Sequence, residues 1–243
     1  MRDQTGLTLV EGQREIRQVL KAHVPVEKIF VCPELCDQGF YRELLSWKKG
    51  GPIVLEVSKQ LFSKISFGER QEGLLAVVKP QRISLRDISF KNIPLLVMVE
   101  GVEKPGNLGA ILRTADAAGI DALLVCAGRT DVYNPNVIRA SLGAVFTVPV
   151  VEGDGEAILK FLKEKKITIC TTLPLAKKVY TQVDLKIPLA IVLGSEQNGL
   201  NRFWIDHADT QVKIPMHGQV DSLNVSTSAA IMIYETLRQR KKI

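Results

Sequence analysis

The sequence is poor in cysteine, histidine and aromatic residues. Its 243 residues include four cysteines, three histidines and 6% aromatic residues. Four scattered cysteines are too few for a disulfide framework, and they form no close cysteine and histidine pairs of the kind that bind zinc. We therefore expect a chain without disulfides and without a bound metal.

Long apolar stretches are also absent. No uncharged apolar run approaches the roughly 20 residues that a membrane helix needs. The first residues lack an apolar core followed by a small-residue cleavage site, which a secretory signal would have. These two features predict a cytoplasmic protein.

The composition that remains is that of an ordinary globular protein, with 46% hydrophobic and 24% charged residues. A chain of this length has room for one large or two modest domains. Its net charge is +6, and four of the six excess positive charges lie within the first 91 residues. This mild excess permits a polyanionic partner but does not identify one.

From residue 95 onward, short apolar runs alternate with helical patterns. The runs cover residues 95–101, 122–128, 147–151, 167–172 and 189–194, and the expected helices cover 107–118, 134–142 and 156–166. The runs are almost continuously apolar, as strands buried on both faces are. The alternation predicts an α/β fold with a largely parallel sheet.

The first 80 residues have a different pattern and predict a smaller α/β module. We expect a helix over residues 11–22 and strands over 28–32, 52–57 and 73–78. The helix would gather Arg14, Arg17 and Lys21 on one side, either as a face that contacts RNA phosphates or as a solvated surface. The expected domains are therefore 1–80, a linker over 81–94, and 95–243.

The clearest helix is at the C-terminal end. Its apolar residues recur at helical offsets and form one stripe, made of Val225, Ala229, Met232, Ile233 and Leu237. A basic tail follows, with Arg238, Arg240, Lys241 and Lys242. Compensation of the helix dipole and solubility are the simplest explanation for the tail, and RNA contact is the alternative.

Three loops that follow expected strands carry polar residues beyond the needs of a turn. The first spans residues 100–115, where Asn107 is placed to cap a helix and Arg113 lies within that helix. Its glycines do not form the G-x-G-x-x-G pattern, and no Walker A motif is present, so a dinucleotide-dependent enzyme is disfavoured.

The second loop spans residues 193–200 and places Glu196 at the carboxyl end of a buried strand, where α/β sheets bind ligands. The third spans residues 214–228. In it, Ser222 is the expected N-cap of the last helix, which leaves Asn224 without a role in capping.

Together and in this order, the three loops resemble the signature motifs of the SpoU/TrmH family. The matching segments read Asn-Leu-Gly-Ala-Ile-Leu-Arg-Thr-Ala, then Val-Leu-Gly-Ser-Glu-Gln-Asn-Gly-Leu, then Ile-Pro-Met with Ser-Leu-Asn-Val-Ser. Members of this family are S-adenosylmethionine-dependent RNA ribose 2′-O-methyltransferases. The N-terminal module also resembles the ribosomal-protein-like RNA-binding domain of many members, through Val10-Glu11-Gly12 and the helix after it.

The resemblance implies a fold, a cofactor and a set of site residues. The family fold is an α/β sheet whose C-terminal part forms a deep trefoil knot. By similarity, Gly194, Ile214 and Leu223 would line the S-adenosylmethionine pocket. The polar positions associated with catalysis and substrate handling are Asn107, Arg113, Glu196, Ser222 and Asn224. A homodimer is expected, with the stripe of the C-terminal helix as a candidate contact.

The resemblance also suggests roles for these residues. The resemblance places Arg113 at the ribose hydroxyl. A guanidinium is a poor general base, so we disfavour a role as base and expect Arg113 to clamp an RNA phosphate instead. Glu196 would hold Arg113 or Asn107, and Ser222 with Asn224 would orient the nucleotide.

The long N-terminal module favours ribosomal RNA, most simply 23S rRNA, as the substrate. The alternatives are a tRNA 2′-O-methyltransferase and a non-catalytic RNA-binding protein on the same fold. Retention of all five polar positions argues against the non-catalytic reading.

Overall fold

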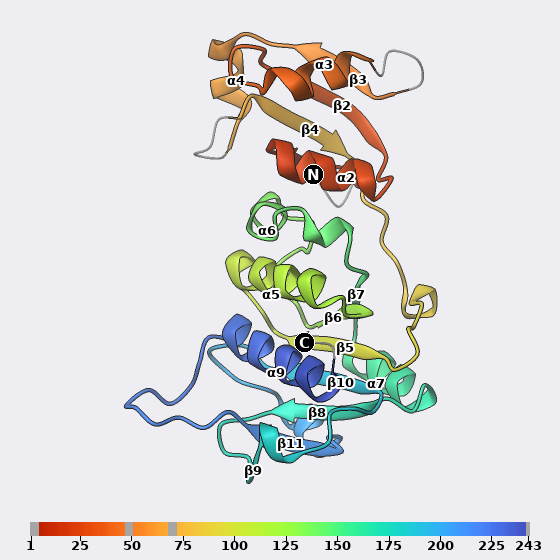
Figure 1. Cartoon of the computed structure of the whole chain (residues 1–243), viewed down its shortest axis with the longest axis vertical. Helices are drawn as coiled ribbons and strands as arrows, with labels where there is room; N and C mark the ends of the chain where they lie inside the picture. The colour runs from red at the N-terminus through yellow and green to blue at the C-terminus, as the bar shows by residue number, and fades with distance from the viewer. Residues whose placement is uncertain (1–4, 47–50, 68–71, 242–243) are drawn as a thin grey trace. The chain divides into compact units, whose positions relative to one another are not determined.

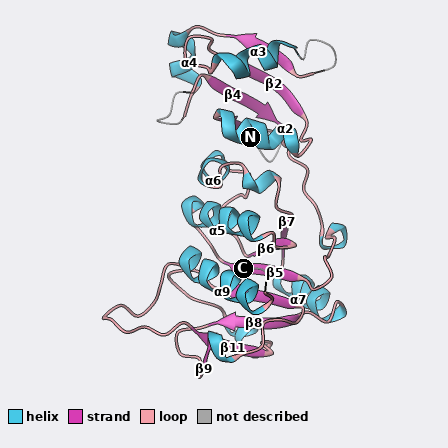
Figure 2. Cartoon of the chain, viewed as in Figure 1, coloured by secondary structure: helices cyan, strands magenta, loops and turns pink. Residues whose placement is uncertain are grey.

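The computed structural model describes residues 5–46, 51–67 and 72–241. The chain forms two compact units (Figures 1 and 2). The first unit contains residues 1–81 together with 133–147, and the second contains 82–132 and 148–243. Among the described residues, no helix combines the length and the apolar composition that crossing a membrane requires.

The first unit is built on a four-stranded sheet with the strand order β1-β4-β2-β3. Strand β4 is antiparallel to β1 and β2, whereas β2 and β3 are parallel. The strands are β1 (Thr8–Glu11), β2 (Val26–Val31), β3 (Ile53–Glu56) and β4 (Leu74–Val78), and the helices between them are α2 (Gln13–Lys21), α3 (Gln38–Ser46) and α4 (Lys59–Ile65).

Helices flank this sheet. Phe62 of α4 is fully buried and packs with Cys32 and Leu75 in one apolar cluster. Helices α2 and α3 are joined through Arg17, whose guanidinium lies 4.3 Å from the centre of the Phe40 ring and 3.1 Å from a Glu43 carboxylate oxygen. The expected helix and strands are present in this unit, but β1, α3 and α4 were not expected. Strand β1 and helix α4 are short, and α3 buries only Phe40 and Leu44, so none of them shows a sustained apolar period.

Residues 133–147 complete the first unit. They contain α6 (Pro135–Ala140) and a single 3₁₀ turn (Ala144–Phe146). The Thr8 hydroxyl donates a hydrogen bond of 2.7 Å to the Tyr133 carbonyl and so joins the segment to β1. We expected this helix from the sequence but placed it in the second domain, because its neighbours in the chain belong there.

The second unit is built on a seven-stranded parallel sheet with the order β7-β6-β5-β10-β8-β11-β9. Its strands are β5 (Leu95–Glu100), β6 (Ala122–Cys126), β7 (Val150–Gly153), β8 (Thr168–Thr172), β9 (Lys178–Val179), β10 (Leu189–Leu193) and β11 (Thr210–Lys213). Strands β5, β6 and β10 are buried along their whole length, which explains their nearly continuous apolar runs, and β8 is buried at its three middle residues. The predicted α/β fold with a parallel sheet is confirmed.

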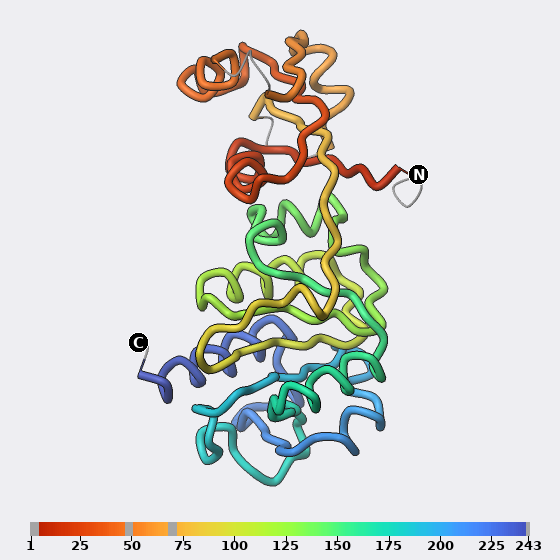
Figure 3. Tube along the Cα trace, turned by 90° about the vertical axis from the view of Figure 1, so that its right-hand side faces the viewer, coloured from red at the N-terminus to blue at the C-terminus, as the bar shows by residue number. Residues whose placement is uncertain are grey.

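Both faces of this sheet are covered by helices. Helices α5 (Pro105–Ala118) and α9 (Val225–Gln239) pack side by side, and α9 also packs on β10 (Figures 1 and 3). An apolar core cluster of this unit joins residues of α7 (Gly155–Glu164) and α8 (Arg202–Asp206) to Leu96 and Met98 of β5. The predicted linker over 81–94 is not a free connection, because its Ile88 is buried in this cluster.

The apolar stripe of α9 faces the interior of its own unit. Each of its five residues is at most 5% exposed. The stripe was expected as a candidate contact between two copies of the chain, and this expectation is wrong. The same residues cannot serve both purposes, because the sheet and α5 already cover them.

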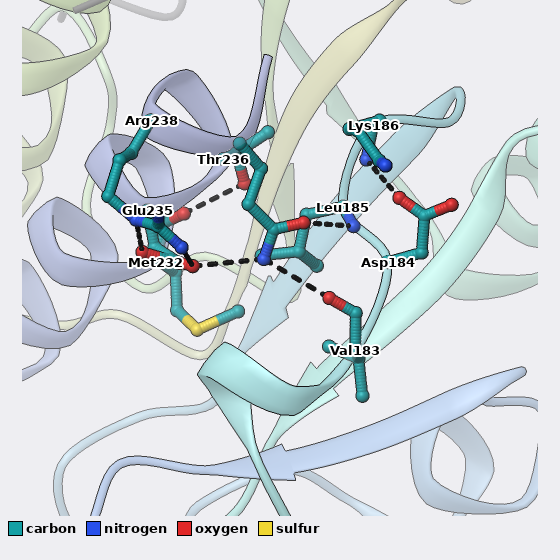
Figure 4. Close-up of polar contacts among 9 residues, drawn as sticks. Val183, Asp184, Leu185, Lys186, Met232, Glu235, Thr236 and Arg238 are labelled. Atoms are coloured by element: carbon teal, nitrogen blue, oxygen red, sulfur yellow. Dashed lines mark hydrogen bonds and ion pairs between the residues drawn. The ribbon is translucent and has the colours of Figure 1, made fainter. Parts of the chain in front are cut away.

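The end of α9 is held by hydrogen bonds to two other segments. The Arg240 guanidinium donates to the carbonyls of Ile93, Pro94, Leu185 and Ile187 at 2.6–3.2 Å. Figure 4 shows the neighbouring turn of α9, where Arg238 donates two hydrogen bonds to Glu235 at 2.7 Å. Arg240 therefore has a structural role, which neither dipole compensation nor RNA contact describes. Lys242 lies outside the described residues.

We predict that Arg240→Met lowers the free energy of unfolding by about 2 kcal/mol, because four backbone carbonyls lose a charged donor while the stem remains apolar. The control is Arg202→Met. Its ion pair with Asp206 is exposed on both sides, so its loss should cost less than about 1 kcal/mol. Urea denaturation of both variants measures the difference in the free energy of unfolding. Equal losses would show that the Arg240 hydrogen bonds do not stabilise the end of α9.

Candidate functional site

The second unit has a pocket at the carboxyl ends of three neighbouring strands. Strands β10, β8 and β11 lie side by side and parallel, so the loops that follow them meet at one edge of the sheet. The pocket has a volume of about 230 Å³. It is lined by residues 172–174 after β8, residues 193–196, 199 and 200 around the β10 loop, and residues 214, 216, 221–223, 225 and 228 after β11.

Gly194 determines the shape of the β10 loop. A Cβ atom on this residue would lie 2.0 Å from the carbonyl carbon of Gly199 and 2.2 Å from the nitrogen of Leu200. The loop closes on itself through a bridge between Ser195 and Gly199, and Gly199 has a φ of +64°. A side chain at Gly194 would force the two strands of this loop apart.

All three residues that were predicted to line a cofactor pocket line this one. Gly194 comes from the second loop, and Ile214 and Leu223 come from the third; each is half-buried. Ser222 and Glu196 also line the pocket, and both are exposed. The pocket thus combines apolar side chains with exposed polar groups and closely approached backbone.

Asn224 is the N-cap of α9, and Ser222 is not. The Asn224 side-chain oxygen accepts hydrogen bonds from the backbone nitrogen and the hydroxyl of Ser226 at 2.9 and 2.6 Å. The Asn224 amide donates to the Asn107 side-chain oxygen at 3.1 Å. Asn107 is not an N-cap either, because α5 begins at Pro105. One asparagine therefore starts the last helix and joins the first loop to the third.

Arg113 and Glu196 are not brought together. Arg113 is exposed on α5 and is not among the residues that line the pocket. Within the described part of the chain, no hydrogen bond or ion pair joins Glu196 to Arg113 or to Asn107. The predicted contact of Glu196 with Arg113 or Asn107 is therefore not present among these residues. Asn107 is hydrogen-bonded to Asn224 instead.

Two contributions to the site were missed from the sequence. Buried Glu100 at the end of β5 accepts hydrogen bonds from the backbone and the side chain of Asn201, at 2.9 and 2.5 Å, and so supports the end of the β10 loop. Thr172 and Pro174 form a pocket wall after β8. Knowledge of the strand order would have predicted the wall formed by Thr172 and Pro174, because β8 is the neighbour of β10.

The basic side of α2 lies in the first unit. Arg14 and Lys21 are exposed, whereas Arg17 is occupied by Glu43 and Phe40. All three cations line a hollow of about 480 Å³ that also includes Glu15 and Glu72. Burial raises the pKa of the Glu15 carboxyl. This side of α2 is therefore mixed in charge and does not form a uniform basic face.

Known proteins carry the same combination of sheet, loops and N-terminal unit. Residues 94–234 match the model of the SpoU rRNA methylase family, and residues 1–76 match the MRM3-like substrate binding domain. The chain belongs to the SpoU rRNA methylase family. This confirms the predicted family, the RNA methyltransferase class of enzyme and S-adenosylmethionine as its cofactor.

Three similar proteins span nearly the whole chain. A 23S rRNA (guanosine-2′-O-)-methyltransferase, RlmB of Bordetella pertussis, is 33% identical over 90% of this chain and 92% of its own. A solved RNA 2′-O ribose methyltransferase is 38% identical with a TM-score of 0.86, covering 99% and 91%. The SpoU methyltransferase AviRb of Streptomyces viridochromogenes, solved with its cofactor AdoMet, is 28% identical with a TM-score of 0.88, covering 100% and 94%.

We predict that Asn224→Ala lowers the free energy of unfolding by about 1 kcal/mol, because the helix loses its cap and Asn107 loses its donor. Asn224→Asp should retain most of the stability, since the carboxylate keeps the acceptor and an inverted Asn107 amide can donate to it. Chemical denaturation of both variants tests this. Equal losses for the two would show that the cap does not depend on the Asn224 oxygen.

Proposed function

We propose that this protein transfers the methyl group of S-adenosylmethionine to a ribose 2′-hydroxyl of 23S rRNA. The observation that supports this most strongly is the pocket, in which Gly194, Ile214 and Leu223 from two separate loops meet at the carboxyl ends of parallel strands. Members of the chain's family that resemble it over nearly its full length are named as rRNA 2′-O-methyltransferases.

The residues of the pocket fit S-adenosylmethionine. Leu193, Ile214 and Leu223 offer apolar surface for the adenine, and the backbone near Gly194 can approach it closely. The wall residue Thr172 has a buried hydroxyl oxygen with no hydrogen-bond partner among the described residues, which leaves a polar atom available beside the pocket. When bound, the cofactor supplies an electrophilic methyl group on a sulfonium.

The protein's own residues would position the ribose for in-line attack, which can supply much of the acceleration. Ser222 and Asn224 would orient the nucleotide at the pocket mouth, since both follow β11 and Ser222 lines the wall. Arg113 would hold the phosphate next to the target ribose, because its planar guanidinium can donate two parallel hydrogen bonds to an anion and its side chain is exposed. Glu196 is exposed at the pocket rim, where it can contact the incoming RNA.

The remaining predictions concern the rest of the molecule. The first unit would hold rRNA, with Arg14, Arg17 and Lys21 along α2 as phosphate contacts, Arg17 being the least available of the three. We further propose a homodimer, a trefoil knot formed by the loops after β10 and β11, and a cytoplasmic location, where the rRNA substrate is found. Residues 1–80 would bind RNA and residues 95–243 would transfer the methyl group, apart from residues 133–147, which fold with the first unit.

The proposal is tested by incubating the protein with a labelled methyl donor and with 23S rRNA and tRNA from a strain that lacks it. We expect one 2′-O-methyl site in 23S rRNA and none in tRNA. The Arg113→Lys variant should lose most of this activity and keep its affinity for S-adenosylmethionine, because a lysine cannot form the bidentate phosphate contact. Methylation of tRNA alone would show that tRNA is the substrate in place of 23S rRNA. Binding of RNA without methyl transfer would favour a non-catalytic protein.

The cofactor pocket has its own test. Gly194→Ala should weaken binding of S-adenosylmethionine by at least about tenfold, because relieving the 2.0 Å contact requires the β10 loop to open by roughly 1 Å. The control is Gly218→Ala, since a Cβ there meets nothing within 4 Å. Titration calorimetry compares the two, and unchanged affinity in Gly194→Ala would place the cofactor elsewhere.

A further inference from the structure

The first unit has a pocket that the methyl-transfer site does not explain. Its volume is about 470 Å³. It is lined by Leu7, Thr8, Leu9, Phe67, Val77, Asn134, Pro135 and Asn136. These residues come from β1, β4, the end of the α4 region and the segment before and within α6, so four stretches of chain meet around it.

The floor of this pocket is sheet. Leu9 and Val77 are direct partners in the register of β1 and β4, and their side chains therefore share one face. Leu9 also packs against the cluster that contains Phe62 of α4, so this is the face that carries α4 (Figure 1). Both residues are only half-buried, which shows that α4 leaves this end of the face uncovered.

One wall is an exposed aromatic ring on a fixed backbone. The Phe67 side chain is 40% exposed. Its backbone nitrogen donates a hydrogen bond of 2.8 Å to a carboxylate oxygen of Glu11, a buried residue at the end of β1. The ring is therefore presented to the pocket from a backbone position that the sheet holds.

Another part of the lining carries amides. The Asn134 side-chain oxygen caps α6 by accepting from the Asn136 nitrogen at 2.9 Å, which leaves its amide group to face other partners. The Asn136 side chain is exposed and makes no hydrogen bond to any residue that the structure describes. Asparagine amides offer a donor and an acceptor together, which matches the hydrogen-bonding edge of a nucleobase.

A cation lies beside Gly6, the residue before Leu7 of the lining. The Lys79 side chain is exposed, and its Cε atom is 4.0 Å from the position that a Cβ on Gly6 would take, next to Leu7. An aromatic face, an amide edge and a nearby cation are the three groups that bind an unpaired nucleotide, through stacking, base-edge hydrogen bonds and phosphate contact.

We propose that this pocket binds one unpaired base of the RNA substrate, stacked on Phe67 and hydrogen-bonded to Asn136. This inference rests on the proposed RNA substrate and adds to it a site for single-stranded RNA in the first unit. A uniform basic surface would bind duplex and single strand by charge alone, whereas this pocket needs a base that is free to leave its helix.

The test compares binding of in vitro transcribed 23S rRNA to the wild-type protein and to Phe67→Leu, which keeps an apolar side chain and removes the stacking face. We expect about five- to tenfold weaker binding, with KM for RNA raised and kcat at saturating RNA unchanged. Phe67→Tyr should restore binding, and Asn136→Ala should weaken it by a few-fold. The matched control is Leu61→Ala, an exposed apolar residue of α4 outside the pocket.

A second comparison isolates the unpaired base. A short oligoribonucleotide should bind Phe67→Leu more weakly than the wild type, while the same sequence annealed to its complement should bind both proteins equally. Equal affinity of wild type and Phe67→Leu for every RNA would overturn the inference and leave the pocket to a protein partner. The proposed function itself fails only if the wild-type protein neither binds nor methylates 23S rRNA, so the two failures are distinguishable.

Discussion

The close approach of Gly194 to Gly199 and Leu200 is the constraint on which the candidate site depends. It folds the loop after β10 back on itself beside the pocket at the carboxyl edge of the sheet. The segment after β11 and the start of α9 then line the space beside that loop. Buried Glu100 supports the same arrangement from β5 by binding Asn201 beyond the loop. A small residue at one position thus determines where three loops meet.

Fixed points on α9 complete this arrangement. At its beginning, Asn224 donates a hydrogen bond to Asn107 of the first loop. At its end, Arg240 donates hydrogen bonds to backbone carbonyls just before β5 and β10. Between these points, the apolar stripe packs against the sheet and α5. The helix cannot slide along the sheet without breaking polar contacts at both ends, and the loop that precedes it is held in register as a result.

The main features of this fold could be predicted from local patterns. The apolar runs identified the central strands, because burial on both faces of a sheet leaves a continuous apolar segment. The offsets from Val225 to Leu237 identified α9, because burial of one side of a helix leaves a period near 3.6 residues. The cap of α9 was assigned to Ser222 in place of Asn224, since two polar residues close together are both suitable and only the observed start of the helix chooses between them. Contacts such as Glu100 with Asn201 join residues about a hundred positions apart, and no local pattern reports them. The short helices α3 and α4 were missed for lack of a sustained period.

The membership of residues 133–147 in the first unit has a consequence for how this chain is divided. The unit is assembled from two stretches of sequence, and Thr8 on the first is bonded to Tyr133 on the second. A single cut after residue 80 would therefore not release an intact fragment. Anyone who wishes to express, exchange or transplant this unit must carry both stretches, and insertions or deletions near residue 140 act on the N-terminal unit although they fall within the sequence of the catalytic one.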